Sequence, residues 1–238
     1  MKQIILTLLF FCGYLPPSFS LQLPDEAGKP SVFDSTMFSN FWTIESDTST
    51  HIRHLHDTLE ISAINGVTLW WNQPLQGKVE ITYKACVMDE GLPGDRLSDL
   101  NCFWMARDKE YPDDIFRRSK WRNGIFGRSY SLTLYYLGYG GNGNTTTRFR
   151  KYNGDFQAFS TGNTRPEILK EYTDDAHLLK ANHWYSIRIV SNGKRIQYYS
   201  DDELIVDFTD EHPYTSGWFG FRTTKSRTRL TDFRIRQL

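Results

Sequence analysis

The segment YYLGYGGNGNTTTRFRKYNG, residues 135–154, is the most informative part of this chain for its fold. Its middle interleaves glycines with asparagines, and both residue types accept positive φ angles, so a sharply bent connection is expected there. The flanking residues are rich in β-branched and aromatic types, which favour strands. We predict a strand, a tight loop and a second strand, with aromatic and cationic side chains beside a loop that a ligand can approach closely. The alternative is an ordinary β-hairpin whose edge carries these aromatic and cationic side chains without binding a ligand.

Strand-like runs recur along the rest of the chain. They cover residues 59–64, 68–71, 78–88, 102–106, 131–137, 146–152, 184–191, 195–200, 203–208, 217–223 and 228–236. Several alternate apolar and polar residues, as in 78–88, which is typical of antiparallel strands with one buried face. Asn192-Gly193 and Asp201-Asp202 predict hairpin turns. The best helical candidate, 166–172, is short, so we predict an all-β fold with two antiparallel sheets, a sandwich or jelly roll.

The N-terminal residues have the features of an export signal. Lys2 precedes a short apolar run, residues 4–11. The small residues Ser18 and Ser20 stand at the positions that a signal peptidase reads, so we expect cleavage after Ser20. A lipoprotein anchor at Cys12 is the less favoured alternative, because Cys12 lies inside the apolar run. We therefore expect a signal peptide at 1–20, one β domain at 21–238, and a periplasmic or extracellular location.

The charge of the chain excludes some partners. Its 28 basic and 28 acidic residues are balanced, whereas a general nucleic-acid binder carries a net basic surface. The apolar run near the N-terminus is too short to span a bilayer, and no other apolar segment approaches that length. We expect no nucleic-acid partner, no membrane span and a monomer.

Two cysteines remain after the expected cleavage, Cys86 and Cys102. Export would permit a disulfide between them, and closing a loop of this size would stabilise the fold by roughly 3 kcal/mol. Two buried thiols in the β core are an equal alternative. Neither zinc-ligand spacing nor a cysteine nucleophile is indicated.

Residues 107–129 interrupt the succession of strands. This segment is charged and shows little alternation, and loops of this length are usually functional or disordered. Its aromatic residues, Tyr111, Phe116, Trp121 and Phe126, argue against disorder. We expect a packed excursion that lies across one end or face of a sheet.

The order of FWMARD, DDIFRR, the glycine-rich segment, HWYSIRI and the C-terminal GWFGFRTTKSRTRLTDFRIRQL resembles a group of exported bacterial jelly-roll proteins of uncharacterised function. It is more distantly similar to the YesU-type proteins of rhamnogalacturonan-utilisation clusters. The resemblance implies a concanavalin/LamG-like jelly roll and a carbohydrate context, but it supplies no catalytic set. The chain lacks the Gln-Ile-His triplet and the Glu-x-Asp-x-x-Glu strand that would be expected of some other jelly-roll lyases and hydrolases.

Our main functional hypothesis is cleavage of an acidic, uronate-containing polysaccharide by β-elimination. This reaction needs a cation beside the carboxylate, a base and an acid for the leaving oxygen. Arg148 and Arg150 would share one strand face and suit bidentate carboxylate recognition. Tyr135 and Tyr139 are the leading acid or base candidates. Further candidates are Tyr136, Tyr152 and His183. Packing tyrosines and a solvated arginine face are the ordinary alternative.

The first alternative function is a glycan-binding jelly-roll module without catalysis. Trp104 or Trp121 would stack on sugar rings, Asn142 and Asn144 would bond sugar hydroxyls, and Tyr152 would line the same face. In either case we expect the polysaccharide or oligosaccharide to lie across the concave sheet near the glycine-rich loop, under the 107–129 excursion.

The second alternative is a glycoside hydrolase that uses paired carboxylates. Candidates are Asp108, Glu110, Asp113, Asp114, Asp201, Asp202 and Glu203. No cofactor is indicated by the residues themselves. Calcium is common in this fold class as a structural ion, but the chain has no EF-hand-like ligand series, so metal ligands stay unassigned.

Overall fold

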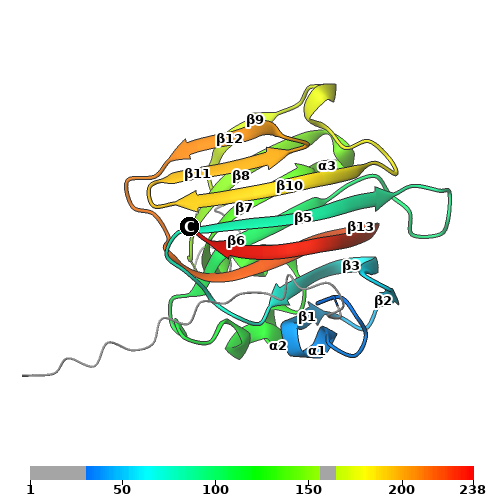
Figure 1. Ribbon diagram of the computed structural model, residues 1–238, viewed down its shortest axis with the longest axis horizontal. Coiled ribbons are helices and arrows are strands. Elements are labelled where there is room, and N and C mark those ends of the chain that lie inside the picture. Colours follow the sequence, from blue (N-terminus) through cyan, green and yellow to red (C-terminus); the bar gives the residue numbers. More distant parts are fainter. Residues whose placement is uncertain (1–30, 156–164) are drawn as a thin grey trace, which may run out of the picture.

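The computed structural model describes residues 31–155 and 165–238, where the chain forms two facing layers of strands (Figure 1). The predicted signal peptide and Cys12 lie outside the described residues. The strands are β1 (Trp42–Ser46), β2 (Thr50–Leu55), β3 (Thr58–Trp71), β4 (Leu75–Gln76), β5 (Val79–Met88), β6 (Leu100–Asp108), β7 (Leu132–Gly140), β8 (Thr146–Asn153), β9 (Ile168–Tyr172), β10 (Trp184–Asn192), β11 (Arg195–Ser200), β12 (Glu203–Thr209) and β13 (Ser216–Gln237). Three single-turn helices are α1 (Phe38–Phe41), α2 (Ser119–Arg122) and α3 (Gly141–Asn144). No helix in this described part is long and apolar enough to cross a membrane.

The long strand β13 belongs to both layers. Its first part pairs with β6, and its last part pairs with β5. Between the two parts the pairing register shifts, and Lys225 has a positive φ of 49°, which bends the strand. The first layer runs β3-β13-β6-β7-β8-β9, and the second runs β13-β5-β10-β11-β12. All pairings are antiparallel, as predicted, but the two runs predicted at 217–223 and 228–236 are one continuous strand.

The main core fills the space between the layers. It is built from alternate positions of each strand, as the pattern in 78–88 predicts: Val79, Ile81, Tyr83, Ala85 and Val87 all point inward from β5. Ile187 and Tyr198 lie beside them in the same layer, and the facing side chains of the first layer include Trp104, Tyr135, Leu137, Phe149, Phe219 and Phe221. Two sheets packed through such alternating apolar positions are stabilised mainly by the burial of apolar surface.

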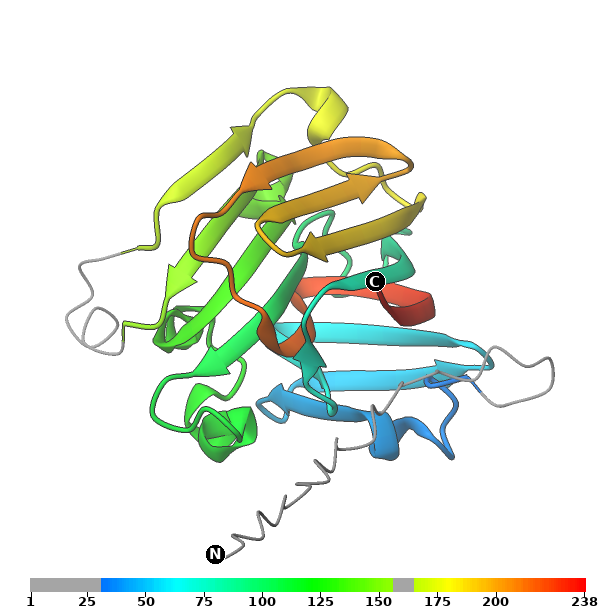
Figure 2. The ribbon, with the colours of Figure 1, turned by 60° about the vertical axis from the view of Figure 1, so that its left-hand side comes forward.

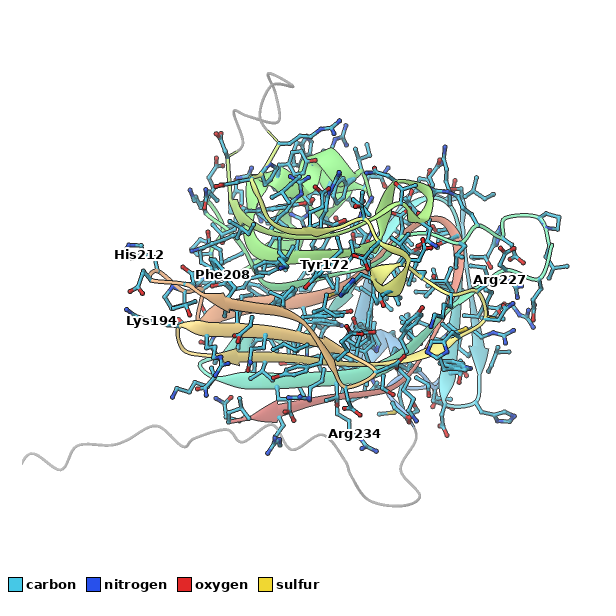
Figure 3. All side chains as sticks on the ribbon, turned by 90° about the horizontal axis from the view of Figure 1, so that it is seen from above. Tyr172, Lys194, Phe208, His212, Arg227 and Arg234 are labelled. Carbon is cyan, nitrogen blue, oxygen red and sulfur yellow. The ribbon has the colours of Figure 1, made fainter. Side chains whose placement is uncertain are left out.

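Side chains of β9 and β12 join the two layers at one side. Tyr172 on β9 donates a hydrogen bond to the backbone oxygen of Ile205 on β12 at 2.9 Å, and Phe208 packs on Phe149 with ring centroids 5.5 Å apart. Figure 3 shows Tyr172 and Phe208 in this region, and it shows Lys194 at one end of the sandwich with Arg227 at the opposite end.

Residues 109–131, between β6 and β7, form the packed excursion that was predicted at 107–129. They contain α2 and 3₁₀ turns at Ile115–Arg118 and Phe126–Ser131. The excursion covers part of the outer face of the first layer, beside β1 (Figure 2). The second apolar cluster lies under it: Trp70, Phe103, Ala106, Ile115, Leu132, Leu134, Tyr136, Tyr152 and Trp218.

Two contacts fix the excursion to the sheet. Arg122 on α2 forms a buried salt bridge with Glu45 on β1 at 2.8 Å. Further along, Gly124 meets Gly66 of β3 so closely that a Cβ on Gly124 would lie 2.1 Å from the Gly66 oxygen. Since Gly124 also has a φ of 68°, only glycine fits this approach without strain.

Two expectations about local structure need correction or completion. Residues 166–172 were expected to be helical, yet Ile168–Tyr172 is strand β9, because it pairs with the exposed edge of β8. Cys86 and Cys102 are both buried free thiols. Ala85 and Val87 point into the core, so Cys86 points to the other side of β5, away from Cys102 in the core.

The glycine-rich loop is bent as predicted. Gly140, Asn142, Gly143 and Asn144 all have positive φ angles between 56° and 71°. The loop carries the chain from β7 to β8 in a left-handed turn, which glycine and asparagine adopt at little cost.

Candidate functional site

A cleft of about 610 Å³ opens on the outer face of the first layer. This volume is within the usual range for small-molecule sites. It lies between the glycine-rich loop, the excursion and the sheet. Its lining residues are Asp47, Asn65, Gly66, Asp99, Asn101, Asn123, Gly124, Ile125, Phe126, Tyr130, Tyr136, Gly138, Gly141, Asn142, Thr146, Arg148, Arg150, Arg165, Arg222 and Thr224. The lining is therefore polar and carries four guanidinium groups against two carboxylates.

A row of directly paired residues forms the floor of the cleft. Arg222 on β13 lies opposite Asn101 on β6, which lies opposite Gly138 on β7, which in turn lies opposite Arg148 on β8. Directly opposed residues share one face of an antiparallel sheet. With about 4.8 Å between neighbouring strands, the backbones of Arg222 and Arg148 lie roughly 14 Å apart across the floor.

Gly138 makes room for the side chain of Tyr136. A Cβ on Gly138 would lie 2.2 Å from the Tyr136 hydroxyl oxygen, so the phenol tip lies over the glycine in the middle of the floor. Burial raises the pKa of Tyr136, with the nearby Asp99 charge acting in the same direction. The hydroxyl is therefore protonated at neutral pH and can donate a hydrogen bond.

Arg148 and Arg150 lie in the cleft, on one face of β8, as the spacing predicts. Arg148 pairs with Glu171 on the neighbouring strand β9. Arg150 donates a hydrogen bond to the backbone oxygen of Pro166 and lies opposite Tyr136 in the sheet. Both guanidinium groups are held at the β8–β9 side of the cleft by these partners.

The two asparagines of the glycine-rich loop differ in their contacts. Asn142 lines the cleft, and its amide donates only a long hydrogen bond to Thr146 at 3.4 Å. Asn144 instead clamps the backbone of Leu179, donating at 2.9 Å and accepting at 2.8 Å. Asn142 is therefore available to a ligand, whereas Asn144 fixes the loop to the segment before β10.

Asp99, just before β6, and Asn101, on β6, contribute to the cleft. Asp99 has a φ of 66° and accepts hydrogen bonds from Ser98 at 2.7 Å, Arg96 at 3.1 Å and Asn101 at 3.3 Å. These bonds use both carboxylate oxygens. The amide oxygen of Asn101, whose residue is 4% exposed, has no hydrogen-bond partner.

These residues do not suit a calcium ion. The Asp99 carboxylate already faces the guanidinium of Arg96, and a cation would compete with that group. Within residues 31–155 and 165–238, no three His, Cys, Asp or Glu side chains come together as a metal site. Calcium stays a prediction of the fold class, without ligands to assign to it.

Tyr135, Tyr139 and Trp104 point to the opposite side of the sheet from the cleft, into the main core. Tyr135 donates to Asp210 at 2.5 Å, and burial followed by this hydrogen bond raises its pKa. Burial also raises the pKa of Tyr139. Trp104 is 0% exposed and stacks on Phe149. None of the three lines the cleft.

Trp121 and Tyr152 lie near the cleft but do not line it. Trp121 packs under the guanidinium of Arg128, 5.3 Å from the ring centroid. Tyr152 does share the face of Arg148 and Arg150, but it is completely buried beneath Tyr130. Its role is to support the floor through packing.

The carboxylates of the hydrolase alternative lie away from the cleft. Asp108 pairs with Arg118 at 3.2 Å, and Asp201 contacts His183 at 2.6 Å in a hairpin turn. Glu110, Asp113, Asp114, Asp202 and Glu203 are likewise not among the lining residues.

Sequence reasoning missed Arg222 and Asn101, and it named Tyr136 only as a further acid or base candidate. A signal was present for Arg222: Trp218, Gly220 and Arg222 alternate with Phe219 and Phe221 within one strand. An arginine at such a position belongs to the face opposite the core.

Comparison with known proteins places this chain in a family. A model of a domain of unknown function, DUF6250, matches residues 61–233. The chain belongs to the DUF6250 family. The matched range includes every lining residue of the cleft except Asp47. The curated proteins contain no match to the chain.

Solved structures similar to this DUF6250 chain confirm the predicted jelly roll. A Bacillus subtilis protein of unknown function with a galectin-like fold aligns with a TM-score of 0.69 and 15% identity, over 87% of this chain and 94% of that one. The carbohydrate-binding module CBM66 from Bacillus subtilis aligns with a TM-score of 0.55 and 12% identity, over 82% and 95%. The exoplasmic/lumenal domain of VIP36, in a form bound to Ca²⁺ and mannose, aligns with a TM-score of 0.55 and 13% identity, over 83% of each chain. At these identities the likeness concerns the fold alone.

Proposed function

We propose that this DUF6250 protein binds an acidic, uronate-containing polysaccharide in the cleft. The observation that carries the proposal is the polar cleft on the outer face of the first layer, lined by four arginines, two aspartates and four asparagines. Arginine binds carboxylates in a bidentate manner, and amides suit sugar hydroxyls. The similar folds of CBM66, a carbohydrate-binding module, and of VIP36 in its mannose-bound form support the choice of a glycan.

In this proposal, residues on different sides of the cleft make different contacts with the polymer. Arg150 and Arg148 attract the carboxylate groups of the polymer from the β8 side. Asn142, at the tip of the glycine-rich loop, bonds sugar hydroxyls. Tyr130 and Phe126 of the excursion, whose rings pack edge to face at 5.6 Å, offer apolar contact to the sugar rings.

Binding is tested by affinity electrophoresis and calorimetry on the purified protein. Pectic, rhamnogalacturonan and glucuronan polysaccharides are compared with neutral ones, at low and at physiological salt. We expect retention by an acidic polymer that weakens with salt, because exposed charge pairs are screened. Arg150→Gln should weaken retention. The matched control is Arg195→Gln, which removes an exposed arginine on β11 that pairs with Asp207 on β12. Equal retention of the wild type and Arg150→Gln would rule out Arg150 as a contact of the polymer.

β-Elimination is a second candidate function, and the position of Tyr136 favours it. Its protonated hydroxyl lies in the cleft floor opposite Arg150, where it could protonate a leaving oxygen. The mature protein is incubated with each acidic polymer, with and without calcium, and the ultraviolet absorbance of unsaturated uronate products is followed. A rise that Tyr136→Phe abolishes supports elimination. New reducing ends without that absorbance would instead indicate hydrolysis.

Export belongs to the same proposal. A polysaccharide ligand would be met outside the cell, where the signal-like residues 1–20 would direct the chain. Mass measurement of the protein recovered from the periplasm or medium tests for cleavage after Ser20.

A further inference from the structure

Three arginines are buried in the described part of the chain: Arg122, Arg222 and Arg227. Two of them have carboxylate partners. Arg122 pairs with Glu45 at 2.8 Å, and Arg227 pairs with Asp95 at 2.8 Å and with Glu90 at 2.7 Å. Arg222 has no carboxylate within 4 Å among the described residues. A buried charge normally needs an opposite charge. Arg222 therefore differs from Arg122 and Arg227, because it lacks a paired carboxylate.

The surroundings of Arg222 hold it in place without neutralising it. Its Nη1 donates to the backbone oxygen of Gly124 at 2.9 Å and to Thr68 Oγ1 at 3.2 Å. The guanidinium carbon lies 5.1 Å from the centroid of the Phe126 ring. Burial lowers the pKa of Arg222, and the more distant charges of Glu45 and Asp99 act against this effect; arginine stays charged in proteins. The guanidinium is therefore a fixed cation at the β13 end of the cleft floor.

We propose that Arg222 is the carboxylate-binding residue of the cleft floor and gives the site its preference for uronate over neutral sugars. The inference rests on the proposed function, because it assumes that a glycan occupies the cleft. It assigns the main discrimination to Arg222 and not to Arg148 or Arg150. Arg148 already has Glu171 as a partner, whereas a ligand carboxylate would supply the one charge that Arg222 is missing.

The neighbours of Arg222 favour a sugar acid over a small inorganic anion. Asn101 lies directly opposite Arg222 in the sheet, and its amide oxygen is buried without a partner. This oxygen can accept a bond from a hydroxyl but repels an anion. One strand further, Tyr136 places its hydroxyl over Gly138. A uronate has both an acid group for Arg222 and hydroxyl groups for Asn101 and Tyr136.

The test compares one polymer in two forms on the full mature protein. Oligosaccharides of polygalacturonate are titrated calorimetrically beside the same oligosaccharides after chemical reduction of their carboxyl groups. We expect the wild type to prefer the acidic form, and Arg222→Lys to lose about 10- to 100-fold of that preference, as the loss of a charged, bidentate hydrogen bond implies. Tyr136→Phe, which leaves Arg222 in place, should weaken both forms about fivefold. The control is Arg195→Lys on the exposed surface of β11.

The ratio of the two affinities separates binding from folding. A variant that is only partly folded binds less of both oligosaccharides, but its folded molecules keep the wild-type ratio of the two affinities. A melting curve therefore accompanies each titration. Preference retained in Arg222→Lys overturns the inference, and so does a wild type that binds both forms equally, although glycan binding then stands. A wild type that binds neither form, nor any polymer of the wider panel, contradicts the proposed function itself. Stronger, Arg222-dependent binding of a sulfated polysaccharide would overturn the assignment to carboxylate.

Discussion

Glu45→Gln should destabilise this protein far more than a single lost charge usually does. Glu45 is 4% exposed and accepts hydrogen bonds from three side chains: Arg122 at 2.8 and 3.1 Å, Ser119 at 2.9 Å and Trp70 at 3.2 Å. The donors approach both carboxylate oxygens, with Arg122 contacting each of them. Glutamine has the same shape, but in either orientation its NH₂ group would face a donor.

The magnitude follows from what the substitution leaves behind. Arg122 is 1% exposed, and in the Glu45→Gln variant it becomes a buried charge without a carboxylate, bonded to the Ile115 oxygen at 2.6 Å and to at most one neutral amide oxygen of the glutamine. Breaking a buried pair in this way costs about 3–5 kcal/mol. Since about 1 kcal/mol lowers Tm by 2–4 °C in a domain of this size, we expect a fall of roughly 6–20 °C.

Urea titration and differential scanning calorimetry measure the change. Glu211→Gln is the matched control, because Glu211 pairs with Lys194 while both side chains stay more than half exposed, and such pairs contribute about 0–1 kcal/mol. Glycan binding should also weaken in Glu45→Gln, because α2 precedes the cleft residues Gly124 and Phe126. If the two variants lose the same small amount of stability, the salt bridge does not anchor the excursion as argued.

Three further predictions concern the backbone, acid stability and the thiols. Gly124→Ala should lower the free energy of unfolding by more than about 2 kcal/mol, because the new Cβ would lie 2.1 Å from the backbone oxygen of Gly66. Gly143→Ala is the control, since Gly143 has a similar φ of 71° but open space around it, and it should cost about 1–2 kcal/mol. Urea titration of the two variants measures the difference. The hydrogen bond from Arg227 is the main cause that lowers the pKa of Asp95 from 3.8 to about 2, so the unfolded state takes up this proton first as the pH falls. This stabilisation, roughly 2 kcal/mol above about pH 4, is lost between about pH 4 and pH 2, and Asp95→Asn should flatten that part of the stability curve; an unchanged slope would contradict the assignment. Cys86 and Cys102 should resist a thiol reagent in the native mature protein, because both are buried and burial raises the pKa of both thiols, that of Cys102 to about 12. After unfolding without reductant, both thiols should react. Fewer than two reactive thiols would indicate a disulfide.

Much of the architecture was predictable from local patterns. Alternation in 78–88 correctly identified the inward face of β5, and the turn residues identified both hairpins of β10, β11 and β12. The pairing of residues 168–172 with β8 was not predictable in this way, because this edge strand is short and Lys170 and Glu171 disfavour a strand, while Ile168 and Tyr172 favour one. The short strands β1 and β2 also went unpredicted, although both contain strand-favouring residues.

The face on which each candidate side chain lies was harder to predict, and β6 and β7 show why. Nearly every residue of both strands is buried, because the core covers one face and the excursion covers the other. Alternation then separates two sets of positions but does not say which set faces the cleft. Tyr135 and Tyr136 are adjacent tyrosines of similar burial, yet the first bonds Asp210 in the core and the second lies on the cleft floor. Choosing between them required the position of the excursion.

Arg148 and Arg150 were predictable because β8 is only partly buried, so their shared face follows from their spacing. For Arg222, the face of the strand was predictable from the sequence but the burial of the side chain was not. Its neighbours Phe219 and Phe221 indicate the core face, which places Arg222 on the other side, but its burial arises from Phe126 and Gly124, about a hundred positions earlier in the chain. A buried arginine without a carboxylate is a property of the assembled sheet and excursion together. Local sequence can therefore assign its face, while the missing partner, which is the reason to assign it a ligand, emerges only from the folded contacts.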